Sequence, residues 1–205
     1  MNCKFSKAKI LEVSKKEFLK YGYQGVSLRK IAKKCKLSTG AIYGNFKNKE
    51  ELFNEIIHKD LKNILNVFKI AKTKTIACND KVIEILKKGE ITQELLDETE
   101  NMYKYMYANR EAFILIYSSI GTKYEKIITD FTEEDIKSTF ELYKKVKGIS
   151  KIEKHKERIL RTIAGDCFKG MIPYLIEFKT YEEAKEYLEL YIKYYISSFL
   201  FLVNI

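Results

Sequence analysis

The sequence predicts an all-α protein in which an N-terminal three-helix domain precedes a larger helical bundle. One proline and nine glycines in 205 residues leave room for long, uninterrupted helices. Hydrophobic residues make up 46% of the chain and recur at helical spacing, and no run alternates apolar and polar residues as a half-buried strand does. A chain of this length can bury the cores of a small domain and a larger one.

Three short helices are predicted at the N-terminal end, over residues 6–21, 27–35 and 39–46. In the second, Ile31, Ala32 and Cys35 share an apolar face, and in the third Ile42 and Phe46 lie four residues apart on one face. The turn between them is Lys36-Leu37-Ser38, with Leu37 inward and Ser38 capping the third helix. The outward residues are Thr39, Gly40, Tyr43 and Gly44. This is the pattern of a helix-turn-helix whose second helix enters the major groove of DNA.

The rest of the chain reads as helices separated by short breaks. A long fourth helix begins near Lys49, continues past Phe68 and connects two predicted domains, 1–48 and 49–205. Residues 71–80 are predicted to form a loop, and Gly148 to Ser150 a break between helices. The later helices are predicted over residues 81–88, 92–108, 111–118, 123–147, 150–177 and 181–203.

The positive charge is concentrated where the helix-turn-helix lies. Residues 1–50 contain 13 Lys or Arg against 3 acidic residues, whereas the other 155 residues contain 25 of each sign. The whole net charge of +10 therefore belongs to this segment. A basic block of this kind is typical of a protein that binds a polyanion, and here it favours nucleic acid over a merely solvated charged surface.

Over residues 10–53 the chain resembles the DNA-binding domain of the tetracycline-repressor (TetR) family of bacterial regulators. The order and spacing of the matching residues hold across more than forty positions, about a fifth of the chain. They are Ile10-Leu11, Phe18, Gly22, Gly25, Val26-Ser27, Ile31-Ala32, Leu37-Ser38, Gly40, Ile42-Tyr43, Phe46, Lys49-Glu50 and Leu52. The remainder resembles the family in length, in helical character and in lacking any clear motif.

Three residues depart from the family pattern. Lys36 replaces the usual glycine in the turn, so a residue with a side chain has to adopt φ > 0 there at a cost of about 1 kcal/mol. Cys35 stands where a smaller alanine is usual. Ser14 also replaces an alanine, and we expect it to be tolerated if its hydroxyl bonds back to the backbone.

The predicted DNA-binding residues surround the turn and the third helix. Tyr43 suits a phosphate or a thymine methyl group, and the resemblance implies that Arg29 reaches a base edge. Ser27 either holds a phosphate at a helix N-terminus or only caps the helix, and Asn45 either reads adenine or is simply solvated. Because the third helix offers so little side-chain chemistry, specificity is expected to rest partly on DNA shape. The full set is Ser27, Arg29, Lys36, Ser38, Thr39, Gly40, Ala41, Tyr43, Gly44, Asn45 and Lys49.

The last two long helices carry apolar stripes that fit either a core or an interface. Gly165 and Gly170 in the first of them are predicted to permit close helix approach. In the family, these two helices pair with their copies to form a four-helix dimer interface, so the resemblance implies a homodimer. Two-fold symmetry is also what a palindromic operator in double-stranded DNA requires.

A small-molecule effector site is implied by the resemblance alone. Aromatic and methionine side chains are dense in the bundle, although an ordinary core accounts for most of them. Asp166 stands out as a carboxylate on an apolar helix, where it either pairs with Arg161 or a subunit neighbour or binds a cationic ligand. The predicted effector residues are Tyr103, Met106, Tyr107, Tyr117, Phe140, Asp166, Phe168, Met171 and Tyr174.

Other functional classes find little support. The sequence has no phosphate-binding glycine loop, nucleophile elbow or metal-ligand cluster, so we expect no enzyme, no cofactor and no metal. Cysteines at positions 3, 35, 78 and 167 have no paired spacing, which favours reduced thiols and a cytoplasmic location, and no stretch is long enough to span a membrane.

The sequence thus predicts a dimeric one-component transcriptional regulator, a repressor that a small molecule releases from its operator. In the predicted coupling, ligand bound under the fourth helix changes the separation of the two recognition helices. The alternative is a sequence-neutral, architectural DNA-binding protein, because phosphate contacts alone also give affinity.

Overall fold

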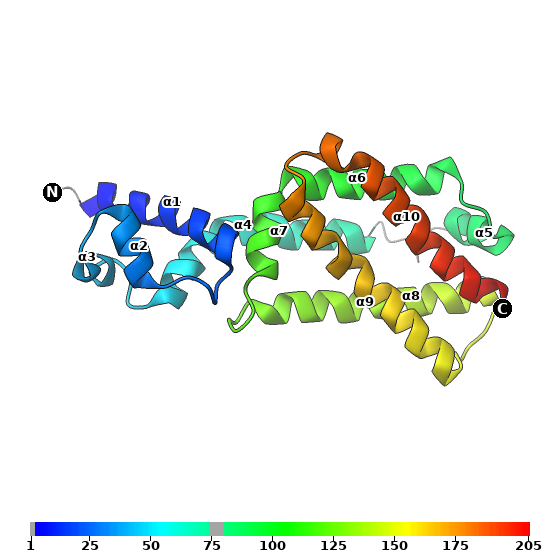
Figure 1. Ribbon diagram of the computed structural model, residues 1–205. Coiled ribbons are helices and arrows are strands. Elements are labelled where there is room, and N and C mark those ends of the chain that lie inside the picture. The colour runs from blue at the N-terminus through cyan, green and yellow to red at the C-terminus, as the bar shows by residue number, and fades with distance from the viewer. Residues whose placement is uncertain (1–2, 74–79) are drawn as a thin grey trace. The chain divides into compact units, whose positions relative to one another are not determined.

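The computed structural model describes residues 3–73 and 80–205, and every regular element in that part of the chain is an α-helix (Figure 1). The predicted all-α class is therefore confirmed. Within the described residues, no helix is both long and apolar enough to cross a membrane. The helices are α1 (Cys3–Tyr21), α2 (Leu28–Cys35), α3 (Thr39–Tyr43), α4 (Lys49–Thr73), α5 (Asp80–Lys88), α6 (Gln93–Ala108), α7 (Arg110–Tyr117), α8 (Glu125–Lys147), α9 (Lys154–Glu177) and α10 (Tyr181–Asn204).

Several predicted boundaries differ from the structure by three residues or more, among them the start of α1, which is Cys3 and not residue 6. Helix α3 ends at Tyr43 and not at residue 46, because Gly44 ends it and the next side chain bonds back to the helix. Helix α4 continues to Thr73 through part of the predicted loop, and residues 74–79 of that loop lie outside the described residues. Helix α9 begins at Lys154, four residues later than predicted, because Ile152 is buried in an extended segment before it.

The chain forms two compact units that do not coincide with the predicted division at residue 48. The first comprises Met1–Asn66 together with Glu111–Ile128, and the second comprises Val67–Arg110 together with Thr129–Ile205. The first unit therefore includes most of α7 as well as the helix-turn-helix. A functional boundary at residue 48 stays a prediction.

An aromatic cluster holds the first unit together. The ring of Phe53 on α4 meets Phe18 of α1 edge to face at 4.8 Å and lies 4.9 Å from Tyr23. The segment after α7 closes over the same region, because the Tyr23 amide donates to the Ser118 carbonyl at 3.1 Å. Gln24 adds a second bond from its side-chain amide to the Ile120 carbonyl, also at 3.1 Å.

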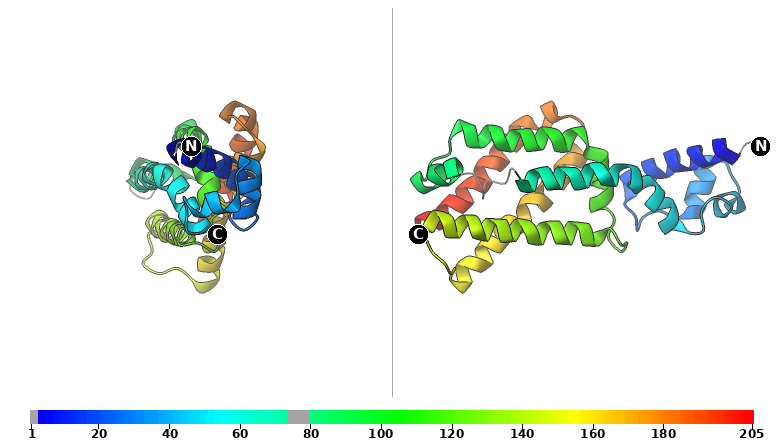
Figure 2. Two further views of the ribbon diagram at one scale, coloured as in Figure 1. Left: turned by 90° about the vertical axis from the view of Figure 1, so that its left-hand side faces the viewer. Right: turned by 180° about the vertical axis from the view of Figure 1, so that it is seen from behind.

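In the second unit, α10 packs against both α6 and α9, and the views in Figures 1 and 2 show α10 running antiparallel to α9. Gly170 of α9 allows this approach, because a Cβ there would overlap the hydroxyl of Tyr191 on α10. The prediction for Gly170 is thus confirmed. Gly165 has no atom of the described residues within 4 Å of an added Cβ, so no close approach is seen there within one chain, and an approach to a second subunit stays a prediction.

Side chains from other helices cap the C-terminal ends of α9 and α10. Arg110 donates from Nε and Nη2 to the Leu175 carbonyl, at 3.0 and 2.7 Å. Lys147 donates to the Val203 carbonyl at 2.7 Å, and the hydroxyl of Tyr143 donates to the Leu202 carbonyl at 3.1 Å. Placing a cation at a helix C-terminus satisfies carbonyls that the helix itself leaves unpaired and complements the helix dipole.

Candidate nucleic-acid interface

The turn between α2 and α3 is a Schellman motif built around a lysine. Lys36 has φ +56, the one positive φ of a non-glycine residue in the described chain. Its amide donates to the Lys33 carbonyl at 3.1 Å, and the Leu37 amide donates to the Ala32 carbonyl at 3.0 Å, which closes the end of α2. The predicted left-handed conformation of Lys36 is confirmed. The next residue, Leu37, is half-buried.

Serine caps begin both helices of the motif. The Ser27 hydroxyl accepts from the Lys30 amide at 3.3 Å, and the Ser38 hydroxyl accepts from the Ala41 amide at 3.1 Å. The predicted caps are confirmed. Each cap satisfies one donor of the first turn of its helix.

Helix α3 presents a small-residue outer face over a buried inner one. Ile42 and Phe46 are buried as predicted, whereas Gly40 and Gly44 are exposed. Tyr43 projects from this face with 56% of its surface exposed, so it is not part of the domain core. The two glycines leave the backbone beside Tyr43 accessible to a closely approaching surface.

Three other predicted contact residues, on α3 and just after it, are less accessible. Thr39 and Ala41 are half-buried. Asn45 is half-buried as well, and its side-chain amide donates to the Ala41 carbonyl at 2.7 Å. In this conformation the amide ends α3, so reading adenine would require that bond to break.

The predicted DNA-binding cations do not all point toward solvent. Arg29 and Lys36 are exposed. Lys49 is half-buried and turns inward: its ammonium donates to the carbonyls of Tyr23 and Val26 at 2.9 and 3.1 Å, and burial lowers its pKa. Lys49 therefore joins the start of α4 to the segment that leads into α2. A phosphate contact from it would compete with both carbonyls.

Sequence reasoning missed Glu17, a carboxylate with only 5% of its side chain exposed. It pairs with Lys34 and lies 3.9 Å from the ammonium of Lys30, so it joins α1 to α2. The available signal was its position, one residue before Phe18 on the stripe that also contains Ile10 and Ser14, where an apolar residue is expected. An acid on such a stripe indicates a buried partner of opposite charge.

The predicted tolerance of Ser14 depended on a hydrogen bond that is absent. The side chain is fully buried, and its hydroxyl has no partner among the described residues. Cys35 is also fully buried, and burial raises the pKa of its thiol. Both side chains are thus part of the domain core and not of its surface.

The predicted effector residues are spread over both units. Tyr103, Met106 and Tyr107 are buried in the second unit, where the Tyr107 hydroxyl donates to the Tyr174 carbonyl at 3.0 Å. Tyr174 stacks on Tyr187 of α10 with ring centres 3.5 Å apart. Phe140 is half-buried in the same unit, Tyr117 belongs to the first unit, and the side chains of Phe168 and Met171 lie outside the described residues.

Asp166 does not pair with Arg161, and its pairing with a subunit neighbour or a cationic ligand stays a prediction. Arg161 instead donates to both carboxylate oxygens of Glu133, at 2.9 and 3.0 Å. The Asp166 side chain is exposed, and its backbone carbonyl accepts from the Tyr191 hydroxyl at 2.9 Å. Asp166 therefore lies on an exposed side of α9, unlike Ala164 two residues earlier, which is buried.

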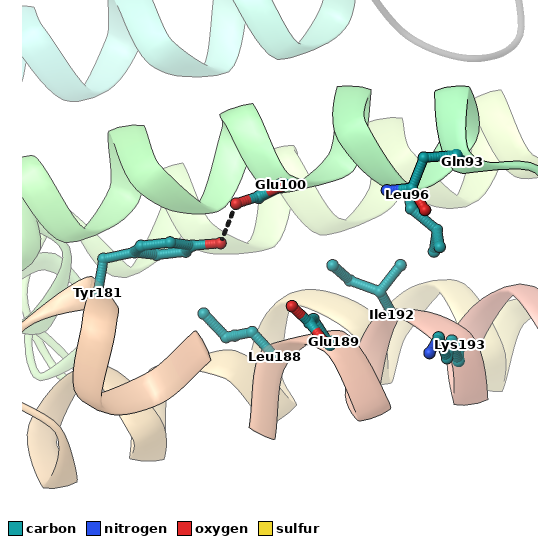
Figure 3. Close-up of a pocket in the computed structure, with 8 residues that line it drawn as sticks. All are labelled: Gln93, Leu96, Glu100, Tyr181, Leu188, Glu189, Ile192 and Lys193. Atoms are coloured by element: carbon teal, nitrogen blue, oxygen red, sulfur yellow. Dashed lines mark hydrogen bonds between the residues drawn. The ribbon is translucent and has the colours of Figure 1, made fainter. Parts of the chain in front are cut away.

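A small pocket lies between α6 and α10 in the second unit (Figure 3). The Tyr181 hydroxyl points across it and donates to Glu100 at 2.7 Å, and Lys104 pairs with the same carboxylate at 2.9 Å. The bond from Tyr181 is the main reason that the pKa of Glu100 is lowered. None of the predicted effector residues is among its described lining, which comprises Gln93, Leu96, Glu100, Tyr181, Leu188, Glu189, Ile192 and Lys193.

Comparison with known proteins places the similarity on the helix-turn-helix. Residues 10–56 match the family described as bacterial regulatory proteins, tetR family. Two curated relatives match segments of similar length. The uncharacterized HTH-type transcriptional regulator YhgD of Bacillus subtilis (strain 168) is 44% identical over 55 residues, which are 27% of this chain and 29% of the relative.

The second relative, the HTH-type transcriptional repressor AcnR of Corynebacterium jeikeium (strain K411), is 33% identical over 58 residues. These are 28% of this chain and 31% of the relative, so the matches span under a third of either relative's length. A crystal structure of a transcriptional regulator of the TerR/AcrR family from Aquifex aeolicus VF5 aligns with 90% of this chain and 98% of its own, at 25% identity and a TM-score of 0.40.

Proposed function

Because residues 10–56 make this chain a member of the tetR family of bacterial regulatory proteins, we propose that it is a dimeric repressor that binds a palindromic operator and is released by a small molecule. The observation that carries the proposal is the outer face of α3, where Tyr43 stands 56% exposed between two exposed glycines. A surface of this shape can approach the floor of a major groove and place one aromatic side chain against base edges or phosphate. The similarity to a repressor, AcnR, supports the sign of regulation.

Dimerisation is supported by apolar side chains that a single chain leaves exposed on α9 and α10. Leu190, Tyr194 and Phe201 lie on one side of α10 with 63%, 69% and 65% of their surface exposed, and Ile176 of α9 is 57% exposed. Residues at this spacing form a continuous stripe along a helix, which a soluble protein normally covers with a partner. A two-fold partner on this stripe would also give the symmetry of a palindromic site.

For the effector, the second unit is the proposed site, because its core combines aromatic rings with buried hydroxyls. Tyr103 and Tyr143 are among the largest fully buried side chains, and Tyr107, four residues after Tyr103, is buried as well. Helix α4 has residues in both compact units, with residues 67–73 in the second, so a ligand bound in the second unit has a continuous helix through which to shift the first part of α4. In a dimer, that shift changes the separation of the two α3 helices and thus the population able to bind the operator.

Selection of binding sites from a random duplex library tests this function, with the recovered sites titrated at several salt concentrations. We expect a palindrome whose half-sites are separated by about 34–36 Å or a multiple of it. Tyr43→Ala should lose enrichment of that palindrome while its thermal unfolding stays unchanged, because the side chain is exposed. Steep salt dependence without enrichment of any sequence would instead indicate the architectural alternative.

The dimer has its own test. Tyr194→Glu adds a charge in the middle of the exposed stripe and should give a monomer in analytical ultracentrifugation, with loss of operator binding. Glu186→Gln changes an exposed residue on the same helix and serves as the control. A Tyr194→Glu protein that remains dimeric would place the interface elsewhere.

A further inference from the structure

The four cations of α2 lie in two rows along the helix. Arg29 and Lys33 are four residues apart and share one side, and Lys30 and Lys34 share the adjacent side. All four side chains are exposed. By charge and exposure alone the four are equivalent, and the sequence assigned a DNA contact only to Arg29.

One row is occupied within the protein. Lys34 forms a hydrogen-bonded ion pair with the buried carboxylate of Glu17 on α1. The ammonium of Lys30 lies 3.9 Å from the same carboxylate and 3.7 Å from the centre of the Tyr21 ring. A buried carboxylate without a cation is strongly unfavourable, so these two lysines stabilise the packing of α2 on α1.

The other row has no such partner. Within the described part of the chain, neither Arg29 nor Lys33 makes a side-chain hydrogen bond, ion pair or ring contact. The row continues into the turn, because Lys36 lies three residues beyond Lys33 and is also exposed. These three exposed cations therefore lie off the side of α2 that pairs with Glu17 of α1.

We propose that Lys33 binds a DNA phosphate beside Arg29, whereas Lys34, its neighbour of equal charge, stabilises the domain and makes no contact with DNA. The assignment rests on the proposed function and deepens it by dividing the basic block into cations that bind DNA and cations that hold helices together. Phosphate is the chemical group concerned, because a lysine ammonium gives a point charge that pairs with it without reading sequence.

The test compares Lys33→Gln with Lys34→Gln, two variants with the same change in net charge at adjacent positions. The probe is a short random-sequence duplex, so no operator is needed. A lost phosphate contact reduces the slope of log Kobs against log[salt] by about 0.9. Between 50 and 200 mM salt, the loss of affinity for Lys33→Gln should therefore be about threefold smaller than for the unmodified protein. Lys34→Gln should keep the original slope.

Thermal unfolding should separate the same two variants in the opposite order. Lys34→Gln should lower Tm because it leaves Glu17 with only the more distant Lys30, whereas Lys33→Gln should leave Tm unchanged. If Lys34→Gln does not fold, Lys30→Gln replaces it, since Glu17 then keeps Lys34. An unchanged slope for Lys33→Gln, or equal slope reductions in both variants, would overturn the assignment. Failure of the unmodified protein to bind the duplex at all would overturn the proposed function, and this assignment with it.

Discussion

The ammonium of Lys49 donates to the backbone carbonyl of Tyr23 at 2.9 Å and lies 4.2 Å from the centre of the same residue's ring. With its second bond, to the Val26 carbonyl, this lysine joins the first residue of α4 to the segment that precedes Ser27. Its charge therefore contributes to the position of α2 within the domain.

Replacing Lys49 with methionine should destabilise the first unit. Methionine keeps most of the apolar stem but leaves two carbonyls without their charged donor, at an expected cost of about 1–3 kcal/mol. Urea unfolding measures the loss. Lys47→Met, at an exposed position two residues earlier, is the control and should have little effect. Equal stability of the two variants would show that the bonds to Tyr23 and Val26 contribute nothing net.

The turn at Lys36 should become more stable with glycine. At φ +56 a side chain costs about 1 kcal/mol that glycine avoids, so Lys36→Gly should raise the free energy of unfolding by about that amount. Lys36→Ala removes the same charge but keeps a Cβ, and it should give no such gain. If both variants gained equally, the removed charge and not the backbone would be the cause.

Two serine-to-alanine substitutions should change the free energy of unfolding in opposite directions. Ser14→Ala removes a buried hydroxyl that has no partner among the described residues, and we expect stabilisation of about 1 kcal/mol. Ser38→Ala removes the cap of α3 and should cost about 1 kcal/mol. Chemical unfolding under identical conditions measures both. Destabilisation by Ser14→Ala would mean that the hydroxyl has a bound water or another partner.

Gly170 and Gly165 give a matched pair on α9. Gly170→Ala forces Tyr191 away from α9 and breaks the bond from its hydroxyl to the Asp166 carbonyl, so it should lower Tm. Gly165→Ala meets no described atom within 4 Å and should gain up to about 1 kcal/mol from helix propensity. A loss of stability at Gly165 that depends on protein concentration would instead indicate that a second subunit approaches there.

The pH dependence of stability should contain a contribution from Asp135, which lies between the buried Thr132 and Thr139 on α8. Burial raises the pKa of its carboxyl to about 6, compared with about 3.9 in an unfolded chain. The folded state therefore binds this proton more tightly, and the contribution of Asp135 to stability falls as pH rises from about 4 to about 6.

Asp135→Asn should remove that fall. At pH about 7 the variant should be more stable by about 3 kcal/mol, and below pH about 4 the two proteins should be equally stable. Unfolding curves across this range test it, with Glu141→Gln as an exposed control on the same helix. A difference that does not vary with pH would assign the effect to packing and not to ionisation.

The parts of the fold that could be predicted are those that local sequence determines. Helix faces follow from the spacing of Ile31, Cys35 and Ile42. The caps at Ser27 and Ser38 each accept from an amide only three residues further along the chain. The direction of Lys49 could not be predicted in this way, because its acceptors lie 26 and 23 residues away in sequence. The same holds for the bond between Tyr23 and Ser118, which depends on how α7 packs.

The positions of the predicted effector residues also could not be predicted from sequence. Tyr174 matched a helical aromatic pattern, but that pattern cannot distinguish a ring that lines a cavity from one that stacks on a neighbouring helix, as Tyr174 does on Tyr187. Asp166 is a carboxylate among apolar neighbours in sequence, which suggests a buried charge, but its side chain is exposed. Periodicity gives the face of a helix but not what covers that face.

The capped ends of α9 and α10 have a consequence for association. Arg110 and Lys147 already fix the last turns of both helices in a single chain, so those turns have little freedom left to lose when another subunit docks. Association is opposed by the ordering of the groups it immobilises. A surface that is rigid beforehand converts more of its apolar contact into affinity, so the proposed pairing of α9 and α10 with their copies would dissociate less readily on dilution.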